Sequence, residues 1–161
     1  MRREFDSLLS PLLGMLASRV KRKMKILFIC RHNRFRSKVA EAYFNKINEN
    51  ENLKAKGAGI FPGRYPLSQD QVKIAKSLGI KIEGRPKAIT TNLLRWKDIV
   101  VAITDDLPKG LFNYGPYTNK VIEWKIPDEL NGNKNKTEKI IREIMKRVND
   151  LIKEYGVENE N

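Results

Sequence analysis

Short apolar runs alternate with amphipathic segments along most of this sequence, and this alternation is the strongest constraint on its fold. Four runs have the length and composition of β-strands: Lys25–Cys30, Asn52–Gly59, Asp98–Thr104 and Lys120–Trp124. Helical signals occupy three further segments: Ser37–Ile47, Ser68–Gly79 and Thr137–Tyr155. Strands joined through helices favour right-handed crossovers and a parallel sheet. The sequence therefore predicts an α/β three-layer sandwich, with a central parallel sheet of about four strands and helices on both faces.

Residues 24–156 are predicted to form a single domain, because the strand and helix signals run through them without an internal repeat or a linker. The polar stretch 131–136 is predicted to be a loop within this domain. Gly156 is predicted to end the last helix, which leaves 157–161 as a short tail.

Residues 1–23 differ from the rest, because they combine a short apolar run with a cluster of basic residues. The apolar run is too short to span a bilayer comfortably, and no convincing cleavage site follows it. An anchor lying on a membrane surface is an alternative. We interpret residues 1–23 as a poorly ordered extension, or as an upstream addition to a natural start at Met24.

The composition narrows the class of protein. The 161 residues include one Cys and one His, and 32 Lys and Arg against 19 Asp and Glu give a formal charge of +13. A single Cys forms no intrachain disulfide, which favours a reducing, cytoplasmic setting, and neither a metal nor another cofactor is predicted. The positive charge attracts anions such as nucleic acid, an acidic membrane or a phosphorylated substrate, and its sign alone does not choose among them. A monomer is expected.

A loop rich in cations joins the first strand to the first helix. Cys30 ends the strand, at the sheet edge where ligands of open α/β proteins bind. Free amide N–H groups and the positive end of the helix dipole favour an anion there, and the Arg36 guanidinium can bind two of its oxygens. The same field favours Cys30 as a thiolate. The residues predicted to surround a bound phosphate are Arg31, His32, Asn33, Arg34, Phe35, Arg36 and Ser37.

A plainer interpretation treats Cys30 as a small buried hydrophobic residue, which is the commoner role of a lone cysteine. Against it stands the conjunction of a strand end, a cysteine, five residues, an arginine, a hydroxyl residue and an immediate helix. Packing alone does not require these features together, so the conjunction favours a reactive site.

The Cys-x5-Arg-Ser pattern of this loop resembles the low-molecular-weight protein tyrosine phosphatase family, which also contains arsenate reductases of the same fold. The resemblance covers most of 24–155. Its later matches are the stretches 57–59, 79–90 and 124–128. It implies that Cys30 is the nucleophile, that Arg36 binds the phosphoryl oxygens, that Ser37 hydrogen-bonds the cysteine sulfur and that Asn33 helps to hold the loop. It also implies an Asp near the C-terminal end as the general acid.

Asp128 is assigned as this acid, because it follows the last strand on the carboxyl side of the sheet. Its plainer interpretation is an ordinary turn aspartate. Glu129 is its nearest rival, and Asp105 and Asp106 after the preceding strand are weaker candidates. Three further cations either line the mouth of the site and favour acidic substrates or are simply solvated: Arg31, Arg34 and Arg64.

Three positions of the loop depart from the family pattern, with His32 in place of a Gly, Phe35 in place of a second Cys and Lys38 in place of a Pro. His32 would be strained if its position requires a positive φ. Phe35 removes the thiol that forms a reversible disulfide with the nucleophile in many relatives. Since the chain has no other Cys, arsenate reduction by an internal cysteine relay is excluded.

The sequence therefore predicts a cysteine-dependent phosphomonoester hydrolase that acts through a phosphocysteine intermediate, with Cys30, Arg36 and Asp128 as its catalytic residues. Its expected substrate is a phosphotyrosine protein or a small phosphomonoester. Two alternatives stay open. One is a phosphate- or nucleic-acid-binding protein with little catalysis, and the other is an arsenate reductase that depends on an external thiol.

Overall fold

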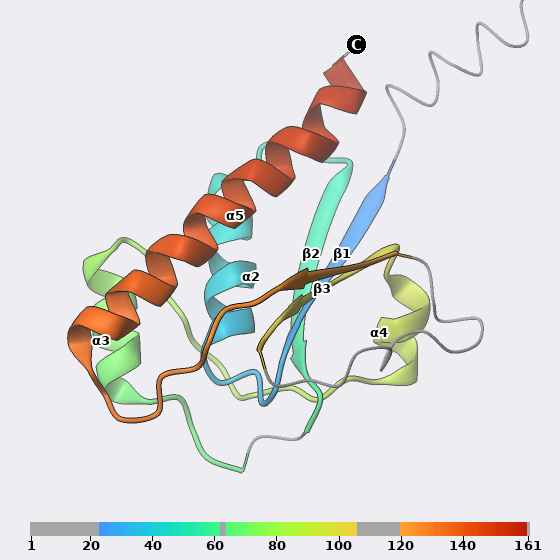
Figure 1. Cartoon of the computed structure of the whole chain (residues 1–161). Helices are drawn as coiled ribbons and strands as arrows, with labels where there is room; N and C mark the ends of the chain where they lie inside the picture. The colour runs from blue at the N-terminus through green and yellow to red at the C-terminus, as the bar shows by residue number, and fades with distance from the viewer. Residues whose placement is uncertain (1–22, 62–63, 106–119, 161) are drawn as a thin grey trace, which may run out of the picture.

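The structure is a computed structural model that describes residues 23–61, 64–105 and 120–160. In these residues one four-stranded sheet is formed, in the order β2-β1-β3-β4, and every neighbouring pair is parallel (Figure 1). The strands are β1 (Met24–Cys30), β2 (Leu53–Gly59), β3 (Ile99–Ile103) and β4 (Lys120–Trp124). The predicted α/β fold and the four predicted strands are confirmed.

Helices cover both faces of the sheet, as predicted. They are α2 (Arg36–Ile47), α3 (Gln69–Ser77), α4 (Thr91–Trp96) and α5 (Lys134–Glu160). Figure 1 shows α2, α3 and α5 gathered on one side of the sheet and α4 on the other. The larger hydrophobic cluster joins the sheet to α2, α3 and α5, and a smaller cluster lies towards α4.

Strand β1 lies in the middle of the sheet and is buried on both faces. Ile26 and Phe28 belong to the larger cluster, whereas Leu27 and Ile29 belong to the smaller one, and all four side chains are 0% exposed. This alternation is the two-fold repeat of a strand in a doubly covered parallel sheet. It fixes Cys30 at the carboxyl end of the central strand, between β2 and β3.

The ends of the helices follow local signals at most positions. Ser68 caps α3, since its Oγ accepts a hydrogen bond from the backbone N–H of Gln71 at 3.4 Å, and Gly79 follows α3 with a φ of 82°. Both were predicted. Helix α4 was not predicted. It is only six residues long, and Thr90 caps it through a 3.1 Å bond from the Leu93 N–H.

Two predictions about α5 are wrong. The helix begins at Lys134, inside the stretch 131–136 that was predicted to be a loop, because the Asn133 side chain caps it by accepting a 3.0 Å bond from the Lys136 N–H. It also continues past Gly156, which is not among the described glycines with positive φ. A glycine inside a helix costs only about 1 kcal/mol relative to alanine, so it weakens a long helix without ending it.

The predicted extension 1–23 lies outside the described residues, apart from Lys23. Within the described part of the chain, none of the helices is both long and apolar enough to cross a lipid bilayer.

Candidate active site

The loop after β1 folds around the sulfur of Cys30, which is 3% exposed. The backbone N–H of Asn33 points to Sγ at 3.3 Å, and the Ser37 hydroxyl lies 3.0 Å from Sγ. The Ser37 oxygen also accepts a 2.6 Å bond from the Asn33 side-chain amide, and its own O–H is the donor to the sulfur when Cys30 is a thiolate. Two donors therefore converge on the sulfur, an arrangement that stabilises a thiolate.

Asn33 gives this loop its sharp turn. It has a φ of 56°, which is in the left-handed region, and its side chain is fully buried. Its Oδ1 accepts a 3.0 Å bond from the backbone N–H of Lys87 while its Nδ2 donates to Ser37. The strain considered for His32 is not found, because the left-handed residue is its neighbour. Asparagine adopts this conformation more readily than most residues, so the loop turns without a glycine.

The end of β2 supports the loop from behind. Gly59 pairs with Cys30, and a Cβ at Gly59 would lie 2.6 Å from the carbonyl carbon of His32. The N–H groups of Ile60 and Phe61 then donate to the carbonyls of Cys30 and Arg31 at 3.0 and 2.9 Å. Only glycine allows the two backbones to lie this close together.

The N-terminus of α2 is suited to bind an anion. The helix begins at Arg36, and its N-cap residue Phe35 makes no side-chain capping bond. No acidic residue lies in the first turn. The unpaired N–H groups and the positive helix dipole are therefore available to an oxyanion at this position.

Lys38 ties α2 to a neighbouring segment. It is 4% exposed, and its Nζ donates a 3.0 Å bond to the carbonyl of Glu83. Burial lowers the pKa of Lys38, with Glu41 opposing this effect and Lys87 adding to it. Together with the bond from Lys87 to Asn33, this contact holds residues 83–87 against the loop.

The Arg36 guanidinium is buried and is fixed by the segment that follows the edge strand β4. The side chain is 1% exposed, and Nη1 donates to the Ile126 carbonyl at 2.8 Å. Nη2 lies 3.6 Å from Oδ2 of Asp128, and Nη1 lies 3.9 Å from Oδ1 of Asp105. The structure thus brings Arg36 and the predicted acid together. Asp105 is half exposed beside them, and Asp106 lies outside the described residues.

The segment after β4 distinguishes Asp128 from Glu129. Asp128 is 29% exposed at the pocket, and its Oδ1 accepts a 2.9 Å bond from the N–H of Glu129. The Glu129 side chain is buried, with its Oε1 accepting a 2.7 Å bond from the N–H of Asn131. The Glu129 carboxylate is therefore held in a local turn, and the geometry favours Asp128 as the group that meets a leaving atom.

Gln71 anchors the segment that carries Asp128 and Glu129, which we call the acid segment. The sequence did not predict this contact. Its Nε2 donates a 2.9 Å bond to the carbonyl of Glu129, across 58 residues of sequence. Gln71 lies in the predicted helix after Ser68, and nothing in the local pattern separates it from an ordinary helix residue. A contact to a distant backbone carbonyl has no sequence signature.

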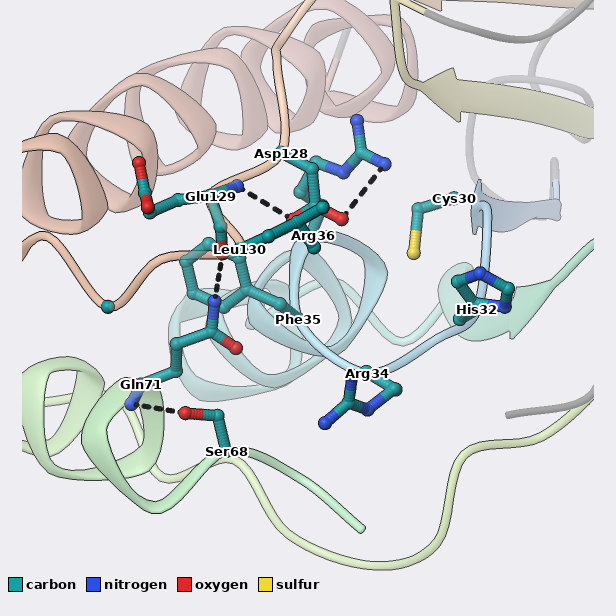
Figure 2. Close-up of a pocket in the computed structure, with 11 residues that line it drawn as sticks. Cys30, His32, Arg34, Phe35, Arg36, Ser68, Gln71, Asp128, Glu129 and Leu130 are labelled. Carbon is teal, nitrogen blue, oxygen red and sulfur yellow. Dashed lines mark hydrogen bonds and ion pairs between the residues drawn. The ribbon is translucent and has the colours of Figure 1, made fainter. Parts of the chain in front are cut away.

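These elements enclose a pocket of about 230 Å³ (Figure 2). Its lining residues are Cys30, His32, Arg34, Phe35, Arg36, Ser68, Gln71, Asp128, Glu129, Leu130 and Gly132. Asn33 and Ser37 are buried behind it. Of the three cations expected near the mouth, Arg34 lines the pocket, whereas Arg31 lies over the Phe61 ring at 5.9 Å and Arg64 is exposed elsewhere. Within the described ranges, no group of three or more His, Cys, Asp or Glu could hold a metal ion.

A parallel sheet with a Cys-x5-Arg loop of this geometry after its first strand defines the class of low-molecular-weight phosphatases. The chain belongs to the family described as "Low molecular weight phosphotyrosine protein phosphatase", whose profile matches residues 25–161, and it is a phosphatase of this type.

One curated relative and two solved structures show what the chain is similar to. The protein-arginine-phosphatase of Bacillus subtilis (strain 168) is 30% identical over 108 residues, which are 63% of this chain and 71% of that protein. The crystal structure of a low-molecular-weight protein tyrosine phosphatase from T. tengcongensis is 27% identical, with a TM-score of 0.71 over 82% of this chain and 99% of that chain. An arsenate reductase from Archaeoglobus fulgidus DSM 4304 shares the fold, at 23% identity and a TM-score of 0.65, over 79% of this chain and 98% of that chain.

Proposed function

We propose that this phosphatase hydrolyses phosphorylated protein side chains through a phosphocysteine intermediate. The observation that carries the proposal is the shared pocket of the Cys30 sulfur, the Arg36 guanidinium and the Asp128 carboxyl group. A two-step displacement at phosphorus requires a nucleophile, a group that binds the phosphoryl oxygens and an acid. All three line this one cavity.

In the first step, written here for a phosphate ester, the Cys30 thiolate attacks phosphorus, forming an S–P bond while the bond from phosphorus to the leaving oxygen breaks. The amide groups at the start of α2 and the Arg36 guanidinium bind the three non-bridging oxygens. Asp128, in its carboxylic acid form, gives its proton to the leaving oxygen. The products of this step are phosphocysteine and the free hydroxyl of the substrate.

In the second step a water molecule attacks the phosphocysteine. The Asp128 carboxylate takes a proton from this water as the new P–O bond forms and the S–P bond breaks. The departing sulfur is received as a thiolate by the Asn33 N–H and the Ser37 hydroxyl, which lie 3.3 and 3.0 Å from it. Inorganic phosphate leaves, and both catalytic groups return to their initial protonation states.

The names of the relatives support the proposed class of substrate. The family is named for phosphotyrosine proteins, and the Bacillus subtilis relative is named for arginine. Phosphoryl groups on protein side chains are common to both names. They also fit a pocket that is bounded on one side by the exposed side chain of Leu130, which offers apolar surface to a leaving group.

The test compares the wild type with Cys30→Ser on para-nitrophenyl phosphate. We expect turnover in the wild type and a loss of about 10⁴-fold or more in the variant, because a neutral hydroxyl is a poor nucleophile without a thiolate's charge. Vanadate binding by Cys30→Ser should persist, since the amide groups and Arg36 remain. Equal turnover in both proteins would overturn the nucleophile assignment.

Two other outcomes identify the alternatives. Tight phosphate binding by a wild type that does not turn over the aryl phosphate indicates a binding protein. Arsenite production from arsenate that requires an added thiol, in the absence of phosphatase turnover, indicates a reductase.

A further inference from the structure

The two sides of the pocket mouth carry opposite charges. Asp128 lies on one side, and Arg34 lies on the other, below Cys30 in the view of Figure 2. When the phosphoryl group of a substrate lies at Cys30, the residues next to the phosphorylated residue therefore lie near Arg34.

Arg34 is partly buried, and its side chain is held in place by two neighbouring residues. Its Nε and Nη2 both donate to the carbonyl of Pro66, at 3.1 and 2.9 Å. Its guanidinium carbon also lies 5.7 Å from the centre of the Tyr65 ring. A guanidinium fixed by a carbonyl and an aromatic ring loses little conformational entropy when it binds a ligand.

The charge of Arg34 is not neutralised by the described part of the chain. No ion pair between Arg34 and a carboxylate is found there, and no hydrogen bond from its Nη1 is found either. Arg36, in contrast, lies within 4 Å of both Asp105 and Asp128. Arg34 therefore offers an oriented positive charge and spare N–H donors at the mouth of the pocket.

We propose that Arg34 binds an acidic side chain adjacent to the phosphorylated residue, so that the preferred substrate is a phosphorylated protein segment with an acidic neighbour. The inference rests on the proposed function, since it concerns the same pocket. The formal charge of +13 on the whole chain acts in the same direction, by attracting acidic segments over a longer range. The general attraction has no fixed position, whereas Arg34 holds its charge at one position next to the bound phosphoryl group.

The experiment uses two phosphotyrosine peptides of one sequence, with Glu or Gln on both sides of the phosphotyrosine. The leaving group is identical in the two peptides, so any difference reports the flanking charge. The wild type should prefer the Glu peptide by about fivefold in kcat/KM, and the preference should shrink at high salt. The difference should appear mainly in KM, because the flanking contact is the same in the bound substrate and in the transition state.

In Arg34→Gln the ratio of kcat/KM for the Glu peptide to kcat/KM for the Gln peptide should fall to about one, because the substitution lowers kcat/KM more for the Glu peptide. Arg34→Lys should retain part of the preference, because a lysine keeps the charge without the fork that binds the Pro66 carbonyl. Arg142→Gln is the matched control. It removes the same charge from an exposed position on α5 that does not line this pocket, and it should keep the wild-type preference.

The possible results separate this inference from the proposed function. If the wild type hydrolyses both peptides equally, or if Arg34→Gln keeps the full preference, the role of Arg34 is overturned while the phosphatase activity stands. If the preference falls equally in Arg34→Gln and Arg142→Gln, net charge rather than Arg34 is responsible, and the inference is again overturned. If the wild type hydrolyses neither the peptides nor para-nitrophenyl phosphate, the proposed function itself fails.

Discussion

The loop that holds Cys30 and the segment that holds Asp128 face each other across one pocket, yet they are built differently. In the loop, the contacts of Cys30, Asn33 and Ser37 join buried atoms to one another. In the acid segment Asp128 is 29% exposed and Leu130 is 82% exposed. The acid segment is held mainly at its backbone, through the bond from Gln71 to the Glu129 carbonyl.

This difference corresponds to two different chemical tasks. The phosphoryl group is the same in every substrate, so its binding site gains from donors that are already in place before the reaction. The leaving group varies, and a partly exposed wall can accept different side chains. The buried loop, which is the rigid side of the pocket, is thus suited to bind the phosphoryl group, and the acid segment on the open side is suited to meet the leaving group.

The largest effect on the acid side is expected from Asp128→Asn. It should lower kcat by about 10²–10⁴-fold for aryl phosphates with poor leaving groups, because no proton reaches the departing oxygen. For a good leaving group the loss should be much smaller. Steady-state kinetics on a series of aryl phosphates measures this dependence.

The matched control for that experiment is Glu129→Gln. The Glu129 side chain accepts a bond from the Asn131 N–H and does not face a leaving atom. Any decrease of kcat in Glu129→Gln should therefore be the same for good and poor leaving groups. If Glu129→Gln shows the dependence and Asp128→Asn does not, the assignment of the acid is reversed.

Arg36 connects the two sides, and Arg36→Lys should lower kcat/KM by about 10²-fold or more. Lysine keeps the charge, but it cannot grip two phosphoryl oxygens while bonding the Ile126 carbonyl. Inhibition by vanadate should weaken in parallel. The control is Arg147→Lys on α5, where a surface pair with Glu143 contributes little and activity should be unchanged. Equal vanadate affinity in Arg36→Lys and the wild type would contradict the fork geometry.

A smaller effect is expected from Gly59→Ala, which adds one methyl group beside the Cys30 loop. The new Cβ would lie 2.6 Å from the His32 carbonyl carbon, so the two backbones must separate at a cost of about 1–3 kcal/mol in the free energy of unfolding. Activity should fall as well, since the displaced loop carries the sulfur. Urea unfolding and para-nitrophenyl phosphate turnover measure both effects.

Gly156→Ala is the glycine control for this experiment. A Cβ at Gly156 meets nothing within 4 Å, and the residue lies inside α5. The substitution should therefore stabilise the protein by about 0.5–1 kcal/mol and leave activity as it is. Equal stability changes at the two glycines would mean that the close approach of Gly59 to the loop does not constrain the fold.

The sequence was most informative where the determinants are local. The strand before Cys30, the helix from Arg36 and the cap at Ser68 depend on neighbouring residues, and all three were predicted. The roles of Gln71 and Lys38 could not be predicted, because each bonds a backbone carbonyl that only the fold brings near. Patterns of residue types carry no information about such carbonyls.

The same reasoning explains the errors in α5. A polar run and a glycine are ordinary signals for a loop and for a helix end. Here the Asn133 side chain caps the helix early, and the helix runs through Gly156 because a single glycine weakens a long helix without ending it.

The bond between Arg36 and the Ile126 carbonyl joins residues that are 90 positions apart. The donors around the Cys30 sulfur come from within eight residues, whereas the bond from the Lys87 N–H that holds Asn33 spans 54 positions. The arginine reaches its final position only after β3 and β4 have added to the sheet, and contacts of such high sequence separation form slowly in folding. A chain in which β4 and the residues after it have not yet joined the sheet therefore lacks the Ile126 anchor of Arg36. Under the proposed mechanism, in which Arg36 binds the phosphoryl oxygens, activity is therefore expected only after the last strand has joined the sheet.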